Sequence, residues 1–380
     1  MKKFISAFCA AVMLVSCFCM PASALTADEG QAALDTAFDA MFASVAGDVN
    51  GDGTFSALDA REALLASAGL GNAINEGVAD IDGDGAVTAI DARMLLRISA
   101  QLDSESLLYS ATTKLNLFNA FANNIKASGE RFKFASTITN VDMSYDNQGL
   151  VDKFNKQMNS VPGVEEKIDL GEELLKEKGA VRYSSNTGLR QATNANYPVD
   201  EKDFVSMLSL SDISSIEYRT NQTYTYVAMR STGQERERHE LTGLDSLTVY
   251  LNKEDVSVLP DDTTTLRHGR IFDIPQKNTL VSGYDQINNM FTGLEDLIGT
   301  MSASFVKIGY HDSSVTIYFD RETKKVCATE YNLYYDFTVK LAMDLYFFPL
   351  INIDDSMNIT DKEYTKCAYF FQENYNSLDR

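Results

Sequence analysis

The sequence predicts an α+β protein with a small all-α module followed by a larger α+β domain. Two observations support this prediction. Near the N-terminus, a unit of 24 residues recurs 32 positions further along the chain, which indicates a duplicated structural unit. Residues 107–380 then show a helix, strands, a second helix and strands that alternate apolar and polar residues. We expect this larger part to be a curved antiparallel sheet with helices packed on one face.

The repeated unit carries the pattern of a twelve-residue calcium loop. Gly47–Leu70 and Ala79–Leu102 are identical at 12 of 24 aligned positions. In such loops, positions 1, 3, 5 and 12 supply side-chain oxygens, position 7 supplies a carbonyl, and a glycine at position 6 makes the turn. The predicted ligands of two Ca²⁺ ions are Asp48, Asn50, Asp52, Thr54 and Asp59, and Asp80, Asp82, Asp84, Ala86 and Asp91. Position 12 is Asp in both loops, where the standard EF-hand has Glu.

The residues after each loop also match between the repeats. One helix is expected after each loop, and it starts with Ala57-Leu58-Asp59-Ala60-Arg61 or Ala89-Ile90-Asp91-Ala92-Arg93. In these features residues 47–102 resemble a type I dockerin, the calcium-dependent, EF-hand-like module that attaches cellulosomal proteins to cohesin domains of a scaffold protein. The resemblance implies that six residues contact the cohesin: Ala57, Leu58, Arg61, Ala89, Ile90 and Arg93.

Two points about these contact positions stay open. Familiar clostridial dockerins have Ser or Thr at loop positions 10 and 11, whereas this chain has Ala followed by Leu or Ile. The class of cohesin is therefore not fixed. The apolar positions Leu58, Leu65, Ile90, Met94 and Ile98 are also explained by the buried stripe of two short helices.

The N-terminus is typical of an export signal. Lys2-Lys3, the apolar run Phe4–Met20 and the small residues Ala22-Ser23-Ala24 predict a signal peptide over residues 1–24 and a secreted protein. The alternative is a lipoprotein anchored at Cys17, because the four residues that end there resemble a lipobox. Residues 25–46 have helical spacing of apolar residues and predict an amphipathic helix that leads into the module.

Composition and cysteine content limit the classes of function. The formal net charge of −21 argues against binding to nucleic acid or anionic membranes. After the signal no apolar run is long enough to span a bilayer. Two cysteines remain there, Cys327 and Cys367, and they are a candidate disulfide in an exported chain. Two buried thiols are an equally weighted alternative.

The large domain, residues 107–380, is expected to begin with a helix over Leu107–Ile125 and a strand over Arg131–Tyr145. Ser214–Thr220 and Gln222–Arg230 predict a hairpin, and Tyr284–Met301 predicts a helix. The C-terminal pattern predicts a meander with strands over Ser304–Tyr310, Ser314–Asp320, Lys325–Tyr335 and Phe337–Phe347. His311 and Asp312 would then lie at its first hairpin turn.

The large domain offers no recognisable catalytic motif. Its histidines are His239, His268 and His311, and His239 follows a charged run that is typical of a solvated helix or loop. Adjacent acids occur at Glu165-Glu166, Asp261-Asp262 and Asp354-Asp355, where turn or surface positions explain them best. The chain has no tryptophan, which disfavours a sugar cleft built on tryptophan platforms. Its 18 tyrosines leave stacking of a sugar on tyrosine as an alternative, although tyrosines more often line a sheet face.

These observations predict a secreted calcium-binding protein that docks an α+β domain onto a cohesin-bearing scaffold. The large domain would have an accessory role or bind a polysaccharide or small ligand. The main alternative is an enzyme, a divergent glycoside hydrolase that cleaves O-glycosyl bonds in polysaccharide catabolism and is carried by the dockerin. A third hypothesis places the calcium module against residues 107–380 as an intramolecular cap.

Overall fold

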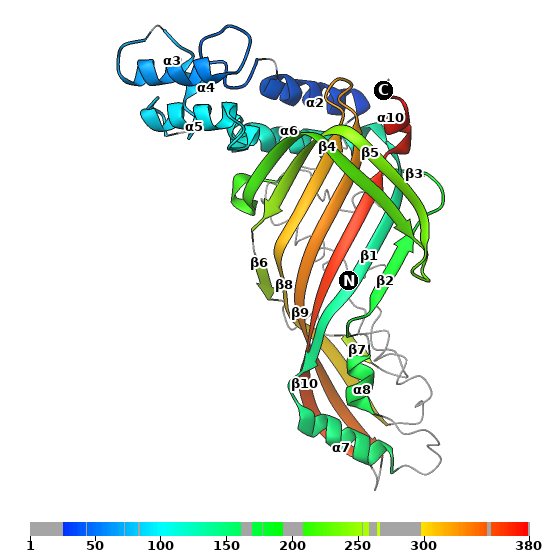
Figure 1. The fold of residues 1–380 in the computed structure, drawn as a ribbon. Helices are drawn as coiled ribbons and strands as arrows, with labels where there is room; N and C mark the ends of the chain where they lie inside the picture. Colours follow the sequence, from blue (N-terminus) through cyan, green and yellow to red (C-terminus); the bar gives the residue numbers. More distant parts are fainter. Residues whose placement is uncertain are drawn as a thin grey trace.

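A curled antiparallel sheet is the central feature of the computed structural model (Figure 1). The structure describes residues 26–378 except 43, 72, 83, 161–168, 177, 193–207, 253, 258–263, 267–297 and 348–350. The strand order is β2-β1-β10-β9-β8-β5-β4. The last two strands fold over the others, so the Ser185 hydroxyl of β2 donates to the Met229 carbonyl of β4 at 2.7 Å. The result is a half-barrel, which confirms the predicted curved sheet.

The long strands account for most of the large domain. They are β1 (Arg131–Tyr145), β4 (Ile213–Met229), β5 (Glu235–Leu251), β8 (Ile298–Phe319), β9 (Val326–Phe347) and β10 (Ile351–Phe370). Shorter strands extend the edges: β2 (Val181–Ser185), β3 (Arg190–Gln191), β6 (Glu254–Ser257) and β7 (Thr264–Leu266). Every pairing between these strands is antiparallel.

One face of the sheet is buried along its length. Along each strand, the apolar residues of this face alternate with the more polar residues of the opposite face. On β10, for example, nearly every second residue from Ile353 to Phe371 is buried, and the residues between them are mostly more exposed. The same core contains the buried residues of α6 (Ala111–Ser128), α7 (Gln148–Met158) and α8 (Leu170–Leu175). The helices thus pack on one face, as predicted, and Figure 1 shows α7 and α8 at the opposite end of the sheet from α6.

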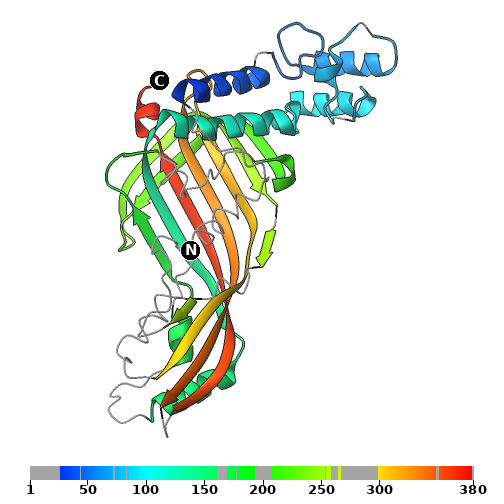
Figure 2. The same cartoon turned by 180° about the vertical axis from the view of Figure 1, so that it is seen from behind.

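The helix that precedes the calcium module is part of the large domain. This helix, α2 (Ala27–Phe42), lies beside α6 across the end of the sheet (Figure 2). Gly30 allows the close approach, since a Cβ there would lie 2.7 Å from the Cβ of Ala127. Leu34, Phe38 and Met41 are buried in the large core. Because α2 and α6 flank residues 44–110 in sequence, the module is an insertion into the large domain.

Several strand ends predicted from the sequence were wrong because the strands continue through them. The predicted break at Asn221 is a β-bulge inside the continuous strand β4, and Asn221 has φ 51°. The predicted turn at Asp312 is likewise a bulge within β8, with φ 47°. The predicted strands are therefore parts of longer ones. Lys325–Tyr335 and Phe337–Phe347 likewise belong to one strand, β9, which has no bulge at Asp336, and β10 was missed. The helix predicted over Tyr284–Met301 lies outside the described residues up to position 297, and the remaining residues begin β8.

The two cysteines are not joined by a disulfide. Cys367 pairs across strands with Tyr331, four residues from Cys327 on β9. Four residues of strand span about 13 Å, well beyond the Cα separation that a disulfide bridges. Both thiols are buried, in separate core clusters, and burial raises the pKa of Cys367 to about 12. The alternative of two buried thiols therefore fits the structure.

Candidate calcium sites and docking face

The module has two loop–helix units that pack on each other. The helices after the loops are α3 (Ala57–Ser67) and α5 (Ala89–Ser99), and a single turn, α4 (Glu76–Ala79), precedes the second loop. Small residues allow α3 and α5 to approach closely, and the buried core consists of Val49, Ala60, Ala63, Ala79, Ala92 and Leu95. This core is separate from that of the large domain. Each loop is thus held at its C-terminal end by a packed helix.

The carboxylates at loop position 12 have the same role in both units. Asp59 and Asp91 are fully buried. One oxygen of Asp59 accepts from the N–H of Val49 at 2.9 Å, and the other accepts from the N–H of Ser56 at 2.8 Å. Asp91 repeats these contacts with Ile81 and Thr88. Both residues complete a capping box at the start of the helix. A position-12 Asp therefore joins the start of the loop to the helix that follows.

Hydrogen bonds curl the first part of each loop, and in the second loop three carboxylates lie close together. Gly53 and Gly85 at position 6 have φ of 84° and 90°, a region that glycine adopts without strain. The N–H of Gly53 donates to Asp48 and that of Gly85 to Asp80, at 2.8 and 2.9 Å. The carboxylates of Asp80, Asp82 and Asp84 all lie within 4.8 Å of one another. Such a set of oxygens fits a hard cation such as Ca²⁺.

The electrostatics of the second loop favour a bound cation. A hydrogen bond from the Asp84 N–H lowers the pKa of Asp82, but burial and the charges of Asp91, Asp84 and Asp80 outweigh it. The pKa of Asp82 is consequently raised. At Asp91 burial raises the pKa, and hydrogen bonds from Thr88 and Asp82 outweigh that effect and lower it. The loop thus holds carboxylates that repel one another, and a divalent cation would relieve this repulsion.

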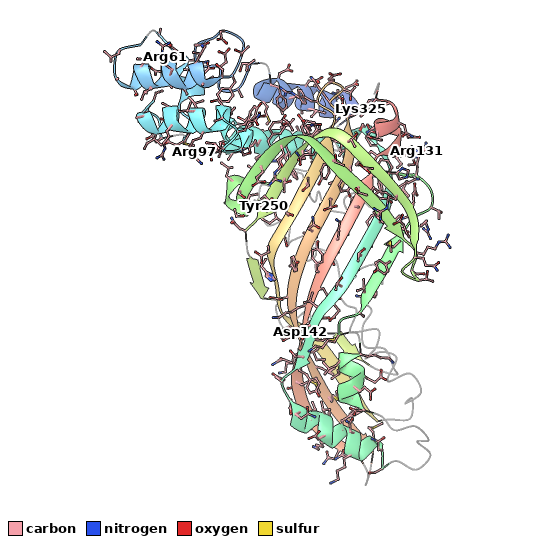
Figure 3. The ribbon with its side chains drawn as sticks, viewed as in Figure 1. Arg61, Arg97, Arg131, Asp142, Tyr250 and Lys325 are labelled. Atoms are coloured by element: carbon pink, nitrogen blue, oxygen red, sulfur yellow. The ribbon has the colours of Figure 1, made fainter. Side chains whose placement is uncertain are left out.

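All six predicted contact residues are exposed. They are Ala57, Leu58, Arg61, Ala89, Ile90 and Arg93. Leu58 and Ile90 are 54% and 52% exposed, so the expectation that they fill a buried stripe is wrong for this pair, while Ile98 is buried at 2%. Figure 3 shows Arg61 on the part of the module that projects away from the sheet. The intramolecular cap hypothesis needed these helices to face residues 107–380, and the structure does not place them there.

Six exposed apolar residues on the module form three pairs that obey the internal repeat. The pairs, each separated by 32 positions, are Leu58 and Ile90, Leu64 and Leu96, and Leu70 and Leu102. All six side chains are at least half exposed. The symmetry fails at Leu65, because its counterpart Arg97 forms a two-pronged ion pair with Asp103, with both N–O distances 2.7 Å. The two halves of the surface are therefore similar but not identical.

A buried joint connects the module to the large domain. In the short 3₁₀ helix η1 (Glu105–Leu108), Leu108 packs on the module core, whereas the next residue, Tyr109, packs on the large core. The ammonium group of Lys114 on α6 donates to the carbonyl and hydroxyl of Ser106 at 2.9 and 3.1 Å. That hydroxyl also accepts from the N–H of Tyr218 on β4 at 2.8 Å. Burial lowers the pKa of Lys114 to about 8, against the opposing effect of Glu217. The connection between the module and the large domain is thus an ordered joint.

The module therefore belongs to the class of duplicated calcium-loop modules, and its two halves expose similar residues. Comparison with protein families identifies residues 46–98 as a type I dockerin domain. Type I dockerins bind calcium and attach their proteins to cohesins. No curated protein and no solved structure matches the chain. The resemblance seen in the sequence is therefore confirmed for this segment.

Of the three acid pairs singled out in the large domain, the structure describes one. Asp354 and Asp355 are exposed on β10, and the other two pairs and His268 lie outside the described residues. His239 is on β5, a strand rather than the expected helix or loop, and it contacts Glu237 and the ring of Phe370. His311 lies at the bulge of β8.

Sequence reasoning missed a buried acidic cluster on the inner face of the sheet. Asp361 and Glu363 are two residues apart on β10 and each is 1% exposed. Asn140 donates to Asp361 at 2.6 Å, and Arg182 pairs with Glu363 at 3.0 Å. The sequence does contain an indication of this cluster, because both acids occupy the buried positions of the alternating pattern of β10. This segment was not among the predicted strands.

This cluster leads to a prediction about pH. Burial, together with the charge of Glu363, raises the pKa of Asp361 to about 7. The folded protein therefore binds more protons than the unfolded chain between about pH 4 and 7, and its stability falls as pH rises through that window. We expect Asp361→Asn to lessen this fall by on the order of 2 kcal/mol. The free energy of unfolding is measured with denaturant at pH 5 and pH 8. Asp354→Asn, at an exposed position of the same strand, is the control. An unchanged fall in the Asp361 variant would contradict the assignment.

Proposed function

We propose that this protein is an extracellular docking protein that binds two Ca²⁺ ions and presents its large domain on a cohesin-bearing scaffold. The proposed calcium ligands are the ten loop residues given above. The single observation that carries the docking proposal is the set of paired, exposed apolar side chains on the dockerin domain. Isolated exposed apolar residues are common, but a symmetric group of them on one small module is typical of an interaction surface.

The proposed cohesin contacts are centred on Leu58 and Ile90, together with Arg61 and Arg93. Each half of the repeat supplies one apolar and one basic contact, so a cohesin has two similar faces to bind. The Arg97–Asp103 ion pair occurs in only one half, which makes the two orientations unequal. The ordered joint at Ser106 supports a further part of the proposal: the large domain is presented in a fixed direction.

The remaining parts of the proposal concern location and cargo. The signal-like sequence over residues 1–24 supports secretion, and among the described residues no helix has the length and apolar composition to cross a membrane. We propose an accessory, ligand-binding role for the large domain.

A cohesin capture experiment tests the docking function. The protein is applied to a panel of immobilised cohesins in Ca²⁺ and in EDTA, and we expect at least one cohesin to retain it only in Ca²⁺. Leu58→Asp and Ile90→Asp are expected to weaken capture by roughly tenfold or less each, because the other face remains, and the double variant to abolish it. Leu210→Asp is the matched control, since Leu210 is 49% exposed on the large domain. Failure of every cohesin to retain the folded protein in Ca²⁺ would overturn the proposal.

A further inference from the structure

A recess lies on the large domain, away from the dockerin surface. It has a volume of about 740 Å³ and is bounded by the start of β4, the end of β5 and the middle of β8. Tyr250 is among the residues that line it, and Figure 3 shows this residue on the side of the half-barrel. On β5 its neighbours Val249 and Leu251 are buried in the large core. Tyr250 itself is more exposed and faces the other side of the sheet.

The bulge in β8 places two polar residues at the recess. The strand register shifts between His311 and Ser314, and Asp312 adopts φ 47°. The buried hydroxyl of Ser313 holds this shape, because it donates to the His311 carbonyl at 3.0 Å and accepts from the Tyr334 N–H at 3.1 Å. Bulges commonly re-aim side chains near binding sites. Here both His311 and Asp312 line the recess.

Hydrogen bonds fix the positions of several side chains around the recess. The Tyr250 hydroxyl donates to Glu217 at 3.5 Å, and Arg219 donates to the same carboxylate oxygen at 2.7 Å. The amide of Asn252 is fixed by a bond to the Ser211 carbonyl at 2.7 Å. The Nδ1 atom of His311 is shielded from solvent and has no hydrogen-bond partner among the described residues. A polar atom in this situation indicates a missing partner.

The chemistry of the lining selects the class of ligand. None of the described residues that line the recess is a lysine or arginine. Arg219 pairs with the Glu217 carboxylate, and the Asp312 carboxylate would repel an anion. Serine hydroxyls and carboxylates offer many hydrogen bonds, which an apolar ligand would leave unmade at a cost. A tyrosine ring can also cover the C–H face of a sugar. We propose that this recess binds a neutral saccharide, with Tyr250 against the sugar ring and Glu217 and Asp312 accepting from its hydroxyls.

Binding measurements with defined oligosaccharides test this proposal. The full protein in Ca²⁺ is titrated with cellohexaose, xylohexaose and mannohexaose by calorimetry, with hexagalacturonate as the anionic probe. We expect at least one neutral probe to bind and the anionic probe to bind at least tenfold more weakly. No binding of any neutral probe, or equal binding of hexagalacturonate, would overturn the proposal.

Variants locate the site and separate ring contact from hydrogen bonding. Tyr250→Ala and Glu217→Gln are expected to weaken binding at least tenfold, and Tyr250→Phe about threefold because it keeps the ring. Tyr183→Ala on β2 and Glu240→Gln on the β4–β5 hairpin are matched controls that should change affinity less than twofold. Thermal unfolding and amide exchange of the large-domain strands show that each variant is folded. Equal binding by Tyr250→Ala and the parent would also overturn the assignment, whatever the outcome of the capture experiment.

Discussion

Replacing Asp91 with alanine is expected to lower the calcium affinity of the second loop by on the order of 100-fold or more. The side chain is a predicted ligand, and it also accepts hydrogen bonds from the N–H groups of Ile81, Asp82 and Thr88. Without it those partly buried donors lose their partner, at roughly 1 kcal/mol each, and α5 loses half of its capping box. We expect the second loop and the first turn of α5 to be disordered even at millimolar Ca²⁺. Calorimetric calcium titration and amide exchange measure the two effects.

The corresponding change in the first loop provides the comparison. Asp59 makes the same set of contacts, but its loop has three carboxylates among the predicted ligands, whereas the second loop has four. Greater ligand charge gives tighter calcium binding in such loops. The loss of total binding free energy should therefore be smaller for Asp59→Ala than for Asp91→Ala. Asp28→Ala, on α2 and outside both loops, is the control. Equal losses in the two loop variants would contradict this order of affinities.

The dockerin could be predicted from sequence because its chemistry is local. Ligand oxygens at fixed spacing and glycine at position 6 specify the calcium loop within twelve residues, and the repeat doubles the signal. The exposure of Leu58 and Ile90 was harder to predict. A short helix with apolar residues on two sides does not reveal which side is buried, and here the small residues Ala60, Ala63 and Ala92 form the core.

The bulges explain two of the errors in the large domain. Asn221 and Asp312 belong to the residue types that tolerate positive φ, and those types also form hairpin turns. Sequence alone does not distinguish a turn from a bulge, because the difference depends on whether the partner strand continues beside it. In the structure the partner strands do continue: β5 runs past Asn221 and β9 runs past Asp312. Both positions are therefore bulges. Strands that looked short are therefore long, and the buried Asp361 and Glu363 lie on one that was not recognised.

The position of α2 could not be predicted from its own sequence. Its apolar stripe indicated a buried face, but the partner α6 begins only after the whole dockerin. The structure shows that Phe38 packs in the large core and that its ring lies near Phe42 and Phe319, with centroid distances of 4.6 and 6.4 Å. Lys324 adds a cation over the ring at 4.9 Å and pairs with Asp35 at 2.8 Å. A residue before the dockerin thus stabilises strands that come after it.

Phe38→Ala is consequently expected to destabilise the large domain by about 3–5 kcal/mol, the usual cost of removing a buried phenylalanine ring. The measurement is amide exchange of β8 and β9 in saturating Ca²⁺, where faster exchange should appear although the substitution is over 250 residues away in sequence from β8. Gln31→Ala, at an exposed position of the same helix, should leave exchange unchanged. If Phe38→Ala loosened only the dockerin and left β9 protected, α2 would belong to the module and the insertion would be wrong. Because the two cores are separate, we expect calcium binding by this variant to persist.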